Sequence, residues 1–105
     1  GFIIKTTDFR ELIQAVPSDA FVGSLATGSK PQDACAADIA RFLAECPHDR
    51  IGVEEQDGLF YVIHISDEPI IWLMVASKSP IFLELRSRHS KWMGEHPGWD
   101  GWMGF

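Results

Sequence analysis

The apolar positions in the first part of the chain recur at helical spacing. Four of them fall at i, i+3, i+4 and i+7, which is one face of a helix: Phe9, Leu12, Ile13 and Val16. Asp8 and Glu11 form a D-x-x-E start signal, and Pro17 disfavours helical backbone at the residue before it. This pattern predicts a helix over residues 8–16, preceded by a short strand at the apolar run 2–4.

A second helical pattern begins near residue 31. Ser29 and Gln32 match a capping box, and Pro31 stands in the first turn, where its missing N–H costs no hydrogen bond. The expected buried stripe consists of Cys35, Ile39, Phe42, Leu43 and Cys46. Because Pro47 follows this stripe, the pattern predicts a helix over residues 31–46.

Residues 17–30 connect the two predicted helices and are mostly small or polar. Phe21, Val22 and Leu25 are apolar, so either a short helical turn or a loop pinned by these side chains fits. The segment Gly23–Lys30 is similar to the phosphate-binding pattern GxxxxGK[ST], but its lysine and serine are exchanged. Because the lysine does not directly follow the glycine, we expect a flexible loop with a capping serine rather than a nucleotide site.

After residue 50 the apolar pattern becomes typical of β-strands. Three segments rich in turn-forming residues separate the predicted strands: 56–58, 66–69 and 77–80. The strands are one that begins at Ile51, followed by 59–65, 70–76 and 81–85. The chain therefore predicts an α+β fold, a single domain over residues 1–105, in which two N-terminal helices pack on an antiparallel sheet of four or five strands.

The predicted sheet has more apolar area than two helices can cover. Ile70–Ala76 is apolar at every position, which is typical of a strand covered on both faces. Two helices can cover only one of these faces. We therefore expect the second face to be covered by the C-terminal tail or by another subunit.

Charge and hydropathy restrict the classes of partner. The formal net charge is −6, which keeps a small domain soluble and repels nucleic acid. The exception is the basic cluster Arg86–Lys91, which is interpreted as a solvated segment or, alternatively, as a site for an anion or an acidic partner. The longest unbroken apolar run, Ile70–Ala76, is far shorter than the ~20 residues of a membrane span. We expect neither a membrane nor a nucleic-acid partner.

Cys35 and Cys46 are the two cysteines of the chain. On one helix they would lie roughly 16 Å apart, beyond the reach of a disulfide. This spacing favours two reduced, buried thiols and a cytoplasmic location.

No motif in the sequence signals catalysis, a cofactor or a metal. The four histidines, His48, His64, His89 and His96, have none of the spacings typical of metal ligands. His64 shares a strand face with Phe60 and Val62, and we expect it to be a hydrogen-bonded core residue rather than a catalytic base. Glu54 and Glu55 should point to opposite faces of their strand, so they cannot act on one substrate atom.

The C-terminal tail, residues 91–105, holds three of the four tryptophans, interleaved with glycines that disfavour a long helix. Aromatic side chains at this density are typical of a buried cover or of an interaction surface. The candidate binding residues are Trp72, His64, Arg86, Arg88, Trp92, Trp99 and Trp102.

Together these features predict a non-enzymatic interaction, inhibitor or accessory module that binds a protein partner and forms a homodimer. The alternative is a small-molecule-binding domain whose pocket lies between the sheet and the tryptophan-rich tail.

Overall fold

The computed structural model describes residues 1–26, 30–58, 60–66, 68–74 and 79–98. Its elements are, in chain order, β1 (Phe2–Lys5), α1 (Thr6–Gln14), β2 (Phe21–Leu25), β3 (Gln32–Cys35), α2 (Ala36–Ala44), β4 (Arg50–Gln56), β5 (Phe60–Ile65), β6 (Glu68–Leu73) and α3 (Pro80–Glu95). The predicted α+β class and antiparallel sheet are confirmed. The described chain forms six strands and three helices, more of each than the sequence predicts.

The sheet is antiparallel throughout and follows the strand order β1-β4-β5-β6-β2-β3. Its centre is the predicted meander β4-β5-β6. Asp57 and Gly58 reverse the chain between β4 and β5 with φ of 55° and 68°, which confirms the predicted hairpin turn. The outer strands come from the N-terminal half of the chain, because β1 pairs with β4 and β2 pairs with β6.

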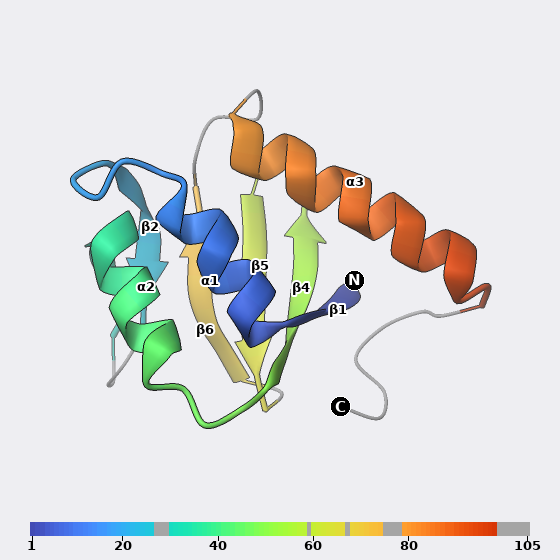
Figure 1. Cartoon of the computed structure of the whole chain (residues 1–105), viewed down its shortest axis with the longest axis horizontal. Coiled ribbons are helices and arrows are strands. Elements are labelled where there is room, and N and C mark those ends of the chain that lie inside the picture. The colour runs from blue at the N-terminus through green and yellow to red at the C-terminus, as the bar shows by residue number, and fades with distance from the viewer. Residues whose placement is uncertain (27–29, 59, 67, 75–78, 99–105) are drawn as a thin grey trace.

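All three helices contribute side chains to one core on the same face of the sheet. Figure 1 shows α1 and α2 side by side in front of the strands, and α3 runs across the upper ends of β5 and β4. The largest fully buried side chains of this core are Tyr61, Phe2, Phe9, Ile13, Ile39, Ile51, Ile63, Ile71, Leu73, Leu85, Val22 and Val53. Burial of each contributes about 1.5–3 kcal/mol relative to exposure, so this face supplies most of the hydrophobic stabilisation.

The first predicted helix is confirmed, although α1 begins at Thr6 rather than Asp8. Asp8 lies in its first turn and does not cap it, because no side chain makes a cap hydrogen bond there. The predicted strand 70–76 corresponds to β6, which runs from Glu68 to Leu73. Residues 75 and 76 of that prediction lie outside the described residues.

The predicted strand 81–85 is wrong, because these residues form the start of α3. Pro80 occupies the first helical turn, where proline is favoured. The buried residues Ile81, Phe82 and Leu85 fall at a helical spacing that places them against the core. α3 continues through Gly94, so the start of the tail is helical despite its glycine.

The second predicted helix is too long. Gln32–Cys35 forms β3, and α2 occupies only Ala36–Ala44, so Pro31 precedes a strand instead of opening a helix. The predicted capping box is also wrong at Gln32, and Ser29 lies outside the described residues. The reason is a long-range pairing: β3 is hydrogen-bonded to β2, within the segment that the sequence assigns to a loop or helical turn.

Candidate functional site

The sheet face opposite the helices is the candidate functional surface, and we call it the open face. Strand alternation places on it, with Lys5 and Arg50 at the β1–β4 edge, the side chains of Ile3, Lys5, Ser24, Asp33, Arg50, Glu54, Gln56, Phe60, Val62, His64 and Trp72. None of the three described helices lies on this side, because their buried side chains join the core on the other face.

Val62 and Trp72 form the apolar centre of the open face. They are direct partners across β5 and β6, and Trp72 in turn pairs with Ser24 of β2. The side chain of Val62 is 4% exposed, and Trp72 is half-buried. The open face therefore has an apolar centre of its own, separate from the helix-side core.

His64 and Glu54 form a polar pair beside this centre. The histidine Nε2 lies 3.0 Å from Oε2 of Glu54, and the two side chains are 14% and 33% exposed. His64 shares the face with Phe60 and Val62 and is hydrogen-bonded, as predicted, but it is half-buried and lies outside the helix-side core. The pair gives the open face one polar anchor next to an apolar surface.

The remaining candidate residues lie elsewhere. Arg88 is paired with Glu84 one turn away on α3, with Nε 3.0 Å from Oε1, and Arg86 is exposed on the same helix. Trp92 packs against the helix-side core and stacks on His96 at a centroid distance of 3.7 Å. The structure thus separates these α3 residues from His64 and Trp72. Trp99 and Trp102 lie outside the described residues.

Sequence reasoning missed the partner of His64. Glu54 lies on the open face, whereas its neighbour Glu55 accepts a hydrogen bond from Tyr61, a core residue on the helix side, at 3.2 Å. The prediction that the two glutamates point to opposite faces is therefore confirmed. The signal that could have found the pairing is the hairpin turn at 56–58, because its position sets which residues of β4 and β5 lie opposite each other.

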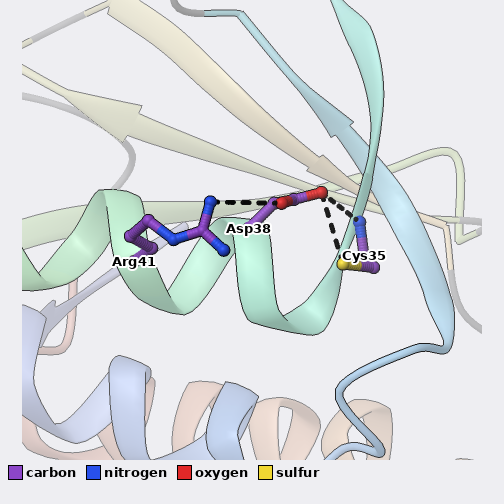
Figure 2. Close-up of polar contacts among 3 residues, drawn as sticks. All are labelled: Cys35, Asp38 and Arg41. Carbon is purple, nitrogen blue, oxygen red and sulfur yellow. Dashed lines mark hydrogen bonds and ion pairs between the residues drawn. The ribbon is translucent and has the colours of Figure 1, made fainter.

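Cys35 and Asp38 form the cap of α2. Oδ2 of Asp38 accepts hydrogen bonds from the Cys35 backbone N–H at 3.2 Å and from its thiol at 3.3 Å (Figure 2). Arg41 approaches the same carboxylate at 3.6 Å. The thiol hydrogen bond, then the backbone one, lower the pKa of Asp38. The arrangement is a reciprocal capping box with cysteine in place of serine or threonine.

The thiols show no nucleophile arrangement in the described part of the chain. The Cys35 thiol donates to a carboxylate, and the Cys46 thiol donates to the His48 carbonyl at 3.8 Å. Activation would require a base or a cation at the sulfur instead. Both cysteines are free, but they flank α2 rather than lying within it as predicted.

Two further properties of the described residues bear on the classes of ligand. No group of three or more His, Cys, Asp or Glu side chains among them is arranged to hold a metal ion. No helix among them has the length and apolar character needed to cross a membrane.

Comparison with known proteins does not assign the chain to a family. No protein-family model, no curated protein and no solved structure matches it. Its function is therefore argued from its own residues.

Proposed function

We propose that this protein is a non-enzymatic protein-interaction module and that the open face is its binding surface. The observation that carries the proposal is the Val62–Trp72 pair, an apolar centre on a sheet face that none of the described helices covers. Trp is enriched among the residues that contribute most to binding, especially when it stands beside other apolar groups.

The partner we propose for this surface is a second copy of the chain. Two copies of a sheet can pack face to face about a twofold axis, so that each Trp72 meets the equivalent centre of its partner. The carboxylate of Glu54 already has a histidine beside it, which lowers the cost of burying it in such an interface. The expected assembly is a homodimer.

Light scattering coupled to size exclusion tests this proposal on the full chain. We expect the mass of a dimer for the wild type and of a monomer for Trp72→Lys, which places a charge at the centre of the open face. The matched control is Leu83→Lys, which changes an apolar side chain on α3 that is 53% exposed, and it should remain dimeric. A monomeric wild type at high concentration, or a dimeric Trp72→Lys variant, would overturn the homodimer.

A second candidate function is the binding of a small molecule on the same face. The His64–Glu54 pair favours it, since a ligand group could hydrogen-bond there while its apolar part contacts Trp72. Tryptophan fluorescence against a compound library tests this function, with His64→Gln as the variant expected to lose quenching. If no compound quenches or raises the unfolding temperature, this candidate fails.

A further inference from the structure

A cavity of about 360 Å³ lies near the outer edge of the sheet, where β1 ends and β4 begins. It is open to solvent and is bounded by the beginning of α1, the end of α2 and the connection from α2 to β4. Its lining side chains and backbone belong to residues 5–7, 10, 43, 44 and 46–50. Its volume falls within the range of small-ligand pockets, which is about 300–1,000 Å³.

The cavity concentrates positive charge in an acidic protein. Lys5, Arg10 and Arg50 line it, three of the nine lysines and arginines in a chain of net charge −6. Asp49 is the carboxylate on its wall. Within the described residues, none of the three cations has an ion-pair partner. The wall therefore carries an excess of positive charge that the described residues leave uncompensated.

Arg10 supplies a second, independent observation. Its Nε atom is inaccessible to solvent and has no hydrogen-bond partner among the described residues. A buried donor of this kind is costly unless an acceptor reaches it. Because Nε itself is not accessible, an anionic ligand in the cavity would contact the terminal N–H groups of this guanidinium.

The walls of the cavity are fixed by Thr6, a buried polar residue that is 5% exposed. Its backbone N–H donates to the Asp49 carbonyl at 2.9 Å, and its hydroxyl donates to the His48 carbonyl at 2.6 Å. These bonds hold the α2–β4 connection against the start of α1. Because no side chain caps α1, the positive end of its dipole also faces this region.

We propose that this cavity binds the phosphate group of a small phosphomonoester. Two guanidinium groups and an ammonium group match a dianion, and guanidinium recognises phosphate through paired hydrogen bonds. The Thr7 hydroxyl adds a further donor on the wall. The cavity is much larger than phosphate alone, and Leu43, Ala44 and Pro47 provide an apolar wall for the organic part.

The test is a titration of the full chain with each probe, in which calorimetry and amide NMR shifts measure binding. The probes are glycerol 3-phosphate, inorganic phosphate and, as the uncharged match, glycerol. We expect saturable binding of glycerol 3-phosphate with shifts at Thr7 and Asp8, weaker binding of inorganic phosphate, and none of glycerol. Absence of saturable shifts would overturn the site. Equal binding of the two phosphates would overturn the role of the apolar wall.

Matched charge changes locate the site. Arg10→Gln should weaken binding roughly tenfold or more, because it removes a charge-assisted contact. Arg86→Gln removes the same charge from α3 and should leave the affinity unchanged. If Arg10→Gln does not fold, Lys5→Gln takes its place, because Lys5 is exposed. If Arg86→Gln weakens binding as much as the cavity variant does, unspecific charge attraction explains the affinity and the proposal is overturned. Trp72→Lys changes the apolar centre of the open face and should not alter this affinity, so the outcome is independent of the proposed dimer.

Discussion

Tyr61 is the only tyrosine of the chain, and its environment is unusual. The residue is almost completely buried, its ring packs against Phe82, and its hydroxyl donates to Glu55. Burial, followed by the charge of Glu55, raises the pKa of Tyr61 to about 12. A group whose pKa is raised by folding stabilises the fold at pH values below its unfolded pKa and loses that contribution as the pH rises.

A single tyrosine makes this shift directly measurable. In an alkaline titration followed by tyrosinate absorbance, the native protein should ionise at about pH 12 rather than near 10, the usual tyrosine value. Stability should fall between those two pH values. Glu55→Gln should lower the pKa only partly, because burial is the larger cause. Ionisation of the folded protein near pH 10 would contradict the described burial.

Gly23 is a position where a side chain would clash with the neighbouring strand. A Cβ atom there would collide with the backbone carbonyl of Trp72 on the neighbouring strand β6. Gly23→Ala should therefore cost about 1–3 kcal/mol of unfolding free energy, as overpacking does. Gly94→Ala is the control, since the space around Gly94 in α3 is open, and it should stabilise by about 0.5 kcal/mol. Urea unfolding measures both, and a neutral Gly23→Ala would refute the close β2–β6 approach.

At the scale of elements, the cap of α2 joins β3 directly to the helix. Removing the acceptor with Asp38→Ala should lower the unfolding temperature, because the Cys35 backbone N–H and thiol lose their shared acceptor. Cys35→Ser should keep the cap, because a hydroxyl also donates to the carboxylate. Asp33→Ala, in the exposed part of β3, is the control and should change little. Thermal unfolding measures the three variants, and equal stability of Asp38→Ala and wild type would show that the cap contributes nothing.

The same region shows what sequence reasoning could and could not predict. The hairpin at 56–58 and helix α1 were predictable, because turn residues and local periodicity determine them. Gln32–Cys35 was not, because its strand conformation depends on pairing with β2, which is sandwiched between β3 and β6. At Pro80 the local signal of a helix start was present, but the apolar run after it favoured a strand. The cavity residues Lys5, Arg10 and Arg50 meet only through the tertiary fold.

At the scale of the whole molecule, Trp92 shows that the first part of the predicted tail is integral to the fold. This side chain packs against the helix-side core, so α3 belongs to the folded body of the protein. Trp92→Ala should cost about 2 kcal/mol. A chain ending at Gly98 should keep its unfolding temperature within a few degrees, because the described residues of the helix-side core lie within 2–92. Circular dichroism on both variants tests this, and an unfolded 1–98 chain would make residues 99–105 part of the core.

The strand order also determines when each part of the molecule can fold. β4, β5 and β6 pair with their neighbours in sequence, whereas Phe2 must find Val53 and Gly23 must find Leu73. Closing long loops is slow, so we expect the central meander to form first and to template the outer strands. On the ribosome, however, the outer strands are synthesised first. During synthesis, β2 and β3 can therefore pair only with each other, and β1 has no partner until β4 has been made.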